Sequence, residues 1–381
     1  MPLENDLDKV LIIGSGPTLI GSVAEMDLMA TEAIDALTEE GIQVVLVNPN
    51  PATISTDKRP DVTVYLEPMT LDFLKRILRM EEPDAIITEY GSTNGLKVAH
   101  KLLQDGILEQ MGIQLLTLNS RMLQMGNQQK RNELLKKLGI DTGKSWELNQ
   151  GIPDSINSNE LTEKITFPVL VTKYNRYVHN EHLHFDNAQD LIDFFKKEKQ
   201  NDNFNWKNYR LTEDLSSWEE VIVDVIRDKD GNTVFINFAG SIEPVKINSG
   251  DSAVTMPALT LNNDHIQELR ESVKKIINNL NLIGFSSFHF AIKHYGTQIK
   301  SKLLTIRPRL TRSAVRTQRI GLYDVGYIVS KVAIGYRLNE IIDPLSGLNA
   351  SIEPTPVSYT HLGAQFLINH IVKQKIQILV H

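Results

Sequence analysis

Short apolar runs alternate with longer segments of helical periodicity in the first third of the chain. Lys9–Ile13 is an apolar run that ends at Gly14, and a helical pattern over Ala24–Leu37 leads to a second apolar run, Val44–Val47. A strand, a turn with glycine, a helix and a second strand predict a βαβ unit with parallel strands. The pattern repeats with further predicted elements at Leu71–Met80, Ala85–Thr88, Leu96–Leu103 and Gln114–Thr117. We therefore expect a doubly wound parallel sheet in the first domain.

The pattern changes beyond about residue 125, where β-branched runs are bounded by polar turns. The predicted strands are Val169–Lys173, Val221–Ile226, Thr233–Ala239, Phe285–Lys293 and Leu303–Arg307. Helices are predicted at Arg131–Leu138, His265–Leu280 and Tyr327–Ala333. The polar stretch Asn149–Thr162 is expected to be a connector, and Asp228–Asn232 is typical of a tight hairpin connection. The second part of the chain should therefore be an α+β domain with antiparallel strands.

Composition and charge narrow the classes of function. Hydrophobic residues make up 41% of the 381 residues, as in folded globular proteins. The net charge of −7 would repel a phosphate backbone, so we do not expect nucleic acid as a partner. The chain has no cysteine, which excludes disulfides, thiolate zinc sites and a cysteine nucleophile. The sequence shows no targeting pattern and no apolar run of about 18 residues, so we expect no membrane span and a cytoplasmic location.

A glycine-rich segment, Gly14–Gly21, lies between the first predicted strand and helix. Glycines at this place allow a tight turn and expose backbone N–H groups at a helix N-terminus. A nicotinamide-dependent oxidoreductase is therefore one alternative. However, the third glycine falls one place late for the G-x-G-x-x-G pattern, and Asn48 stands where a ribose-binding carboxylate is expected. A structural turn or a different ligand is the other interpretation.

Six motifs, taken in order, resemble the large chain of carbamoyl-phosphate synthase. They read GSGPTLIGSVAEMD, VNPNPATISTD, GILEQMGI, VIRDKDGN, NSGDS and KVAIGYRLNEI, and the resemblance covers about residues 8–356. It implies a pre-ATP-grasp domain over residues 1–125 and an ATP-grasp domain over 126–356, with a small lid subdomain at about 146–208. Residues 357–381 do not match the family. A complete large chain would continue into a second homologous half, so a truncated or misread gene product is an expectation.

The resemblance is to the amino-terminal half of the large chain and implies an ATP-dependent carbon–nitrogen ligase. ATP would phosphorylate bicarbonate, and ammonia from a glutamine amidotransferase small chain would attack the carboxyphosphate to give carbamate. The implied cofactors are ATP and Mg²⁺ or Mn²⁺. Metal ions and cations are needed because charge on the transferred phosphoryl group must be neutralised.

The resemblance also implies roles for individual residues. Glu213 and Leu215 match the hinge that grips the adenine base, and Glu220 matches the acid that holds the ribose hydroxyls. Arg309 and Arg312 match two arginines that face the carboxyphosphate and are the candidate catalytic residues. The complete set of candidate nucleotide-binding residues is Glu213, Leu215, Glu220, Lys246, Ile247, Thr172 and Lys173.

The phosphate and metal positions depart from the family. Thr305, Arg307 and His289 stand where the family has a Glu, an Asn and a Gln as metal ligands, which leaves His289 as the only candidate ligand. The two phosphate-contacting arginines correspond to Gln128 and to Thr172 or Lys173, and Tyr174–Glu181 has no glycine for a flap. If each lost donor costs about 3 kcal/mol, two losses slow phosphoryl transfer roughly 10⁴-fold. We therefore expect impaired catalysis, with a nucleotide- or partner-binding pseudoenzyme as the alternative.

Added positive charge is the second consequence of these departures. Arg307, Lys246, Lys173 and Arg176 stand near the predicted phosphate site, where arginines and lysines suit a phosphate or carboxylate. They predict an anion site that works without a metal. In the opposing interpretation these cations pair with acids such as Glu213 and Glu220 and close the cleft.

Overall fold

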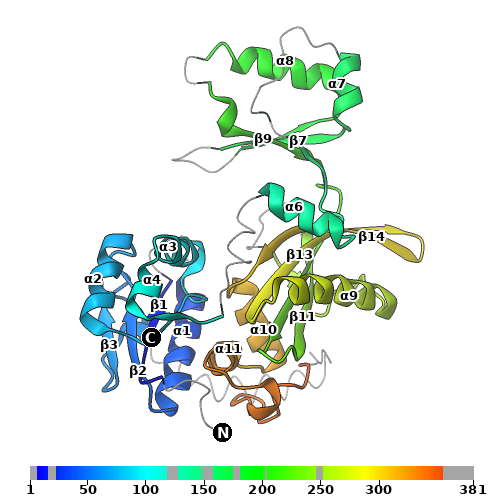
Figure 1. Ribbon diagram of the computed structural model, residues 1–381. Coiled ribbons are helices and arrows are strands. Elements are labelled where there is room, and N and C mark those ends of the chain that lie inside the picture. Colours follow the sequence, from blue (N-terminus) through cyan, green and yellow to red (C-terminus); the bar gives the residue numbers. More distant parts are fainter. Residues whose placement is uncertain are drawn as a thin grey trace.

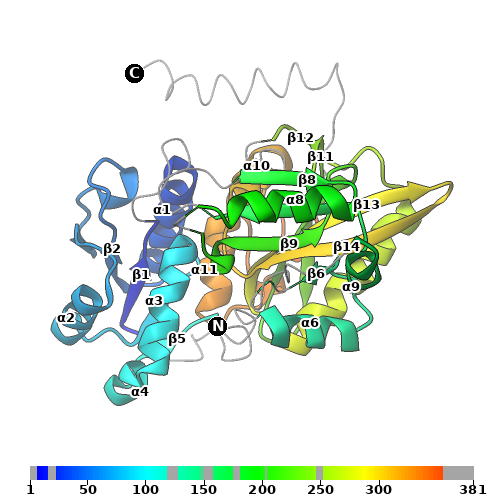
Figure 2. The same ribbon diagram turned by 90° about the horizontal axis from the view of Figure 1, so that it is seen from above.

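The computed structural model describes residues 7–15, 23–117, 128–146, 148, 158–174, 181–201, 204–245 and 252–354. These residues form one parallel and two antiparallel sheets. Figure 1 shows the parallel sheet on one side of the molecule and a small sheet unit that stands apart above helix α6 and strand β14. In Figure 2 the same small unit lies over the larger antiparallel sheet. No helix in the described ranges has the length and apolar character that a membrane crossing requires.

The parallel sheet has five strands in the order β3-β2-β1-β4-β5. Its strands are β1 (Lys9–Ile13), β2 (Gln43–Val47), β3 (Val62–Tyr65), β4 (Ala85–Ile87) and β5 (Gln114–Leu115). Its helices are α1 (Val23–Glu39), α2 (Leu71–Glu81), α3 (Ser92–Gln104) and α4 (Ile107–Met111). Strands β1, β2 and β4 are apolar along most of their length because helices cover both faces of the sheet.

The small unit is a four-stranded antiparallel sheet in the order β6-β9-β7-β8. It comprises β6 (Ser145–Trp146), α7 (Ser158–Lys164), β7 (Val169–Lys173), β8 (Glu181–Phe185), α8 (Ala188–Glu198) and β9 (Tyr209–Glu213). Apolar side chains of β7 and β9, such as Val171 and Leu211, pack on Leu191 and Phe195 of α8. The alternating polar positions of the strands therefore face away from α8.

The second antiparallel sheet has five strands in the order β12-β11-β10-β13-β14. The elements around it are α6 (Gln128–Lys137), β10 (Glu219–Arg227), β11 (Thr233–Pro244), β12 (Val254–Thr255), α9 (Asn263–Leu280), β13 (Gly284–Tyr295), β14 (Gln298–Arg307), α10 (Arg312–Gly321) and α11 (Val325–Ala333). Short 3₁₀ helices are formed by Ile54–Thr56, Trp206–Asn208 and Leu338–Glu340. Helix α9 packs its apolar stripe on one face of this sheet, and the other face shares a core with α10, α11 and the parallel sheet.

Most predicted elements are present, with ends that differ by a few residues. The parallel sheet, the antiparallel sheets and the Asp228–Asn232 hairpin are confirmed. The connector predicted over Asn149–Thr162 is wrong for Ser158–Thr162, which lie in α7, and residues 149–157 lie outside the described ranges. Leu161 is buried against α8, so a tertiary contact stabilises a turn whose polar composition favours a loop.

A buried carboxyl group joins the parallel sheet to the second antiparallel sheet. Glu89 follows β4, is 1% exposed, and its Oε1 accepts a hydrogen bond from Phe285 N at 3.3 Å. A Cβ at neighbouring Gly284 would overlap with that oxygen, and the φ of +82° at Gly284 also favours glycine. Burial raises the pKa of Glu89 to about 8.

This pKa predicts how stability depends on pH. Between pH 4.5, the ordinary pKa of the group, and about pH 8, Glu89 holds a proton in the folded chain but not in the unfolded chain. The free energy of unfolding therefore falls as pH rises through this range. We expect Glu89→Gln to remove a slope of up to about 1.4 kcal/mol per pH unit. Urea unfolding of wild type and variant across this range measures the difference, with exposed Glu109→Gln as control. If the free energy of unfolding depends on pH in the same way for wild type and Glu89→Gln, the raised pKa of Glu89 is contradicted.

Candidate functional site

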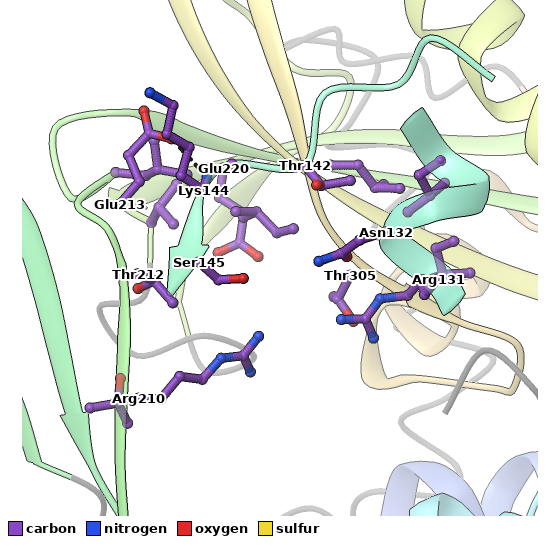
Figure 3. A pocket seen from close by; sticks show the side chains of 18 of the residues that line it. Arg131, Asn132, Thr142, Lys144, Ser145, Arg210, Thr212, Glu213, Glu220 and Thr305 are labelled. Carbon is purple, nitrogen blue, oxygen red and sulfur yellow. Dashed lines mark hydrogen bonds between the residues drawn. The ribbon is translucent and has the colours of Figure 1, made fainter. Parts of the chain in front are cut away.

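A cavity of about 330 Å³ lies between the small unit and the second antiparallel sheet. One wall is the polar face of the small sheet, and the opposite wall is formed by α6, β14 and Glu220 of β10. Figure 3 shows side chains from both walls converging on the space between them. Four lining residues are Arg or Lys (Arg131, Lys144, Arg210 and Arg307) and two are Glu (Glu213 and Glu220).

Strand register places the polar groups of the first wall. Thr172 of β7 pairs with Arg210 of β9 on one side and with His182 of β8 on the other. The Thr172 hydroxyl lies 3.1 Å from His182 Nδ1. Thr212, two residues after Arg210, lies on the same face, because side chains on a strand alternate with a period of two. This face therefore presents a hydroxyl and a guanidinium to the cavity side by side.

One end of the cavity is formed by the chain around Glu213 and Leu215. Lys302 Nζ donates to both carboxylate oxygens of Glu213 at 2.6 Å, and Lys144 N donates to Oε2 at 3.0 Å. Burial raises the pKa of Glu213, but these hydrogen bonds outweigh burial and hold the pKa below its ordinary value. Leu215 is buried with Trp218 and Val245. This end offers an apolar surface beside a fixed carboxylate.

Glu220 lies deeper in the cavity, on β10. Its Oε1 is 2.7 Å from Nδ1 of His289, and both side chains are almost completely buried. His289 Nδ1 is thus hydrogen-bonded to a carboxylate, while His289 Nε2 has no hydrogen-bond partner among the described residues. The pair fixes the orientation of both groups.

Three guanidinium groups line the remaining part of the cavity. Arg131 comes from α6, Arg210 from β9 and Arg307 from the end of β14. In Figure 3, Arg131 and Arg210 reach into the cavity from opposite sides. Burial lowers the pKa of Arg131, and the charge of Arg210 lowers it further. Burial lowers the pKa of Arg307 too, although the charges of Glu220 and Asp224 act in the opposite direction.

The predicted metal positions come together, but their chemistry does not fit Mg²⁺. His289 is directly opposite Thr305 in the pairing of β13 with β14, and Arg307 follows two residues later on the same face. Mg²⁺ is held by carboxylate and other oxygen ligands. The three positions carry one hydroxyl, one imidazole bonded to Glu220 and one guanidinium, which has no acceptor atom. The charges of the nearby carboxylates Glu220 and Asp224 act on this guanidinium. No group of three His, Asp or Glu side chains within the described ranges is arranged to hold a metal.

The structure brings only some of the predicted site residues into the cavity. Glu213, Leu215, Glu220, Thr172, Thr305 and Arg307 line it. Lys173 does not, because its Nζ pairs with Glu198 of α8 at 2.8 Å on the other face of β7. Arg309 and Arg312 are not among the lining residues: Arg309 donates to Leu310 O and to Thr93 Oγ1 of α3, and Arg312 begins α10. Lys246, Ile247 and Arg176 lie outside the described residues.

Two lining residues, Arg131 and Arg210, are not among the predicted site residues. The sequence Tyr209–Glu213 alternates apolar and polar residues, a pattern that places Arg210 and Thr212 on one face of a strand. Helical spacing likewise places Arg131 one turn after Gln128 and one turn before Leu135. Of the cations expected to pair with Glu213 and Glu220, Lys173 pairs with Glu198 instead, while Arg307 interacts with the charges of Glu220 and Asp224. The cavity is nevertheless open, and Glu213 and Glu220 bond Lys302 and His289.

Comparison with known proteins shows the family of this chain. Residues 6–125 match the family model of the carbamoyl phosphate synthase preATP-grasp domain. Residues 127–341 match the carbamoyl-phosphate synthase L chain, ATP binding domain. The carbamoyl phosphate synthase large chain of Clostridium perfringens (strain SM101 / Type A) is 32% identical over 356 residues, which cover 93% of this chain and 33% of that protein. The chain thus spans a third of the length of that curated relative.

Solved structures show the same fold. The biotin carboxylase domain of Hydrogenobacter thermophilus 2-oxoglutarate carboxylase, in complex with MgADP, ADP and bicarbonate, matches with a TM-score of 0.62 and 17% identity, over 87% of this chain and 70% of that one. The biotin carboxylase domain of thermophilic 2-oxoglutarate carboxylase bound to ADP without magnesium has a disordered phosphate tail. It matches with a TM-score of 0.58 and 17% identity, over 87% of this chain and 71% of that one. The predicted fold class, a pre-ATP-grasp domain followed by an ATP-grasp domain, is confirmed.

Proposed function

Because the chain belongs to the family of the carbamoyl-phosphate synthase L chain ATP-binding domain, we propose that its cavity binds an adenine nucleotide. One observation carries the proposal: the cavity has an apolar end at Leu215, a buried carboxylate at Glu220 and guanidinium groups beyond it. In a nucleotide the base is followed by the vicinal ribose hydroxyls and then by the phosphates, so each part would meet a group of matching chemistry. In Figure 3 the Glu213 end and the Arg131 and Arg210 groups lie at opposite ends of the space.

The matching structures support the same ligand. The biotin carboxylase domain in complex with MgADP and bicarbonate has the fold of this chain. The family matches over residues 6–125 and 127–341 also support the proposed division into a pre-ATP-grasp domain, 1–125, and an ATP-grasp domain, 126–356. The separate small sheet formed by β6, β9, β7 and β8 supports the proposed lid at about 146–208.

We further propose that the family reaction is impaired in this chain. In that reaction a bicarbonate oxygen takes the γ-phosphoryl group of ATP, ADP leaves, and ammonia then displaces phosphate from the carboxyphosphate to give carbamate. The proposal follows from the guanidinium of Arg307 at a metal-ligand position, because an arginine repels a divalent cation instead of binding it. Roles for Arg309 and Arg312 at the carboxyphosphate, and docking of a glutamine amidotransferase chain, stay predictions.

Adjacent carboxylates on β10 allow a matched test of nucleotide binding. Glu220 lines the cavity, whereas Glu219 lies on the other face of the strand, where it contacts His294 and Thr260. We expect Glu220→Gln to weaken adenosine and ADP binding about tenfold, because a charged acceptor for the ribose hydroxyls is lost. Glu219→Gln should bind as wild type does. Isothermal titration gives both affinities.

The outcomes separate the two parts of the proposal. Equal affinities for both variants and wild type, or no binding of any adenine nucleotide by wild type, would refute nucleotide binding at this cavity. Release of ADP that bicarbonate and ammonia stimulate would instead show a working ligase and refute the impairment.

A further inference from the structure

Two guanidinium groups of opposite walls face each other across the cavity. Arg131 projects from α6 and Arg210 from β9, and Figure 3 shows both side chains directed into the same space. Within the described ranges, neither guanidinium has a carboxylate at ion-pair distance. The two carboxylates that line the cavity are engaged elsewhere, Glu213 by Lys302 and Glu220 by His289.

Two like charges held together without a counterion are unfavourable. Arg131 is partly buried, and burial followed by the charge of Arg210 on the opposite wall lowers the pKa of its guanidinium. Arg307 lies at the end of β14 in the same cavity, where the charges of Glu220 and Asp224 offset part of its own. An anion that enters between these groups would remove their mutual repulsion and accept several charge-assisted hydrogen bonds.

Neutral donors surround the same space. The hydroxyl of Thr172 stands directly beside Arg210 in the sheet register, and Thr212 lies on the same face of β9. Asn132 follows Arg131 on α6 and also lines the cavity, as Figure 3 shows. A guanidinium fork matches phosphate and carboxylate oxygens alike, but several guanidinium groups together with hydroxyl and amide groups offer more donors than one carboxylate can accept from, which favours the many oxygens of a phosphate chain.

We propose that Arg131 and Arg210, with Arg307, bind the phosphate chain of the nucleotide and replace the divalent cation there. The proposal rests on the nucleotide binding proposed above and goes beyond it, because it assigns the phosphate contacts to two residues outside the predicted site. It also changes the anion site expected from the sequence: Lys173 is paired with Glu198 and does not take part. The ligand class is a polyphosphate whose charge is neutralised by arginines alone.

The test measures binding of three probes in the presence of EDTA: adenosine, ATP and inorganic tripolyphosphate. We expect Arg131→Gln and Arg210→Gln each to weaken ATP and tripolyphosphate binding about tenfold, since each removes a charged donor. Adenosine affinity should stay within about twofold of wild type, because the nucleoside end is unchanged. Arg79→Gln, at an exposed arginine of α2, is the matched control for loss of one positive charge.

Two further readouts separate ligand binding from a structural role. The thermal midpoint of the unliganded Arg210→Gln chain should equal or exceed that of wild type, because a repulsive charge is removed. Arg131→Lys should keep part of the tripolyphosphate affinity, since it keeps the charge but loses the fork.

The results for tripolyphosphate and for adenosine test the arginine site and the nucleotide site separately. Wild-type affinity for tripolyphosphate in both glutamine variants would overturn the proposal while adenosine binding still supported the nucleotide site. Failure of wild type to bind tripolyphosphate or ATP without Mg²⁺ would also overturn it. If tripolyphosphate binds through Arg131 and Arg210 but adenosine does not bind at all, the arginine site stands and the adenine-nucleotide proposal fails.

Discussion

Exchanging Thr305 for Glu and Arg307 for Asn in one variant is expected to make ATP binding depend on a divalent cation. The two positions lie on the same face of β14, two residues apart, beside His289 of β13. The exchange removes a guanidinium and adds a carboxylate and an amide, which shifts the local charge by two units toward negative. In EDTA we expect ATP affinity at least about tenfold below wild type, because the phosphates then meet a carboxylate instead of an arginine.

Addition of Mg²⁺ should restore the affinity of the Thr305→Glu/Arg307→Asn variant, because adjacent oxygen ligands and phosphate oxygens together suit that ion. A control variant, Thr305→Val/Arg307→Leu, loses the guanidinium without gaining oxygen ligands. It should bind ATP weakly with and without Mg²⁺. Isothermal titration of the three chains in both buffers gives the comparison. If Mg²⁺ leaves the first variant unchanged, or rescues both variants equally, the assignment of these positions is wrong.

Replacement of Lys302 by Met is expected to cause the largest loss of stability at the site. Lys302 is 4% exposed, and its ammonium group contacts both oxygens of Glu213. Without it, Lys144 N is the one donor that the described residues still offer to the Glu213 carboxylate, which remains partly buried as a charge. Removing one partner of a buried ion pair lowers the free energy of unfolding by about 3–5 kcal/mol. Because Glu213 is partly exposed, we expect a loss of about 2–3 kcal/mol. Urea unfolding at neutral pH measures the change.

The pH dependence of this loss follows from the direction of the pKa shift. In wild type the pKa of Glu213 lies below its ordinary value, so the pair contributes stability above pH 4.5 and loses it as pH falls further. The difference between wild type and Lys302→Met should therefore shrink in acid. The double variant Lys302→Met/Glu213→Leu should recover most of the stability, because no unpaired charge remains. A double variant less stable than Lys302→Met would contradict the pairing argument.

The fold could be predicted largely from the sequence, because its signals are local. The apolar runs of β1 and β2 and the helix between them specify a parallel unit wherever they occur. Helix α9 is likewise predictable from the local sequence, since its apolar stripe is regular over its whole length. Helix α7 is harder to predict, because its polar sequence favours a loop and the packing of Leu161 on α8 is a tertiary contact that the local sequence does not reveal.

The candidate site could be predicted only in part. Leu215, Glu220 and Arg307 are found by comparison with a family pattern at fixed positions, and all three line the cavity. Arg210 cannot be found in this way, because its relevance depends on β9 lying beside β7 and on the register that puts it opposite Thr172. For Lys173, sequence position alone does not reveal that the side chain lies on the α8 side of the sheet. Long-range pairing, not residue identity, decides which charges meet.

The most direct measurement is the affinity of the wild-type chain for ATP, by isothermal titration, once with EDTA and once with excess Mg²⁺. If arginines neutralise the phosphate chain, ATP binds in EDTA, and Mg²⁺ changes the dissociation constant by no more than about twofold. If instead the chain binds ATP only when Mg²⁺ is present, a metal still holds the phosphates and guanidinium groups have not replaced it.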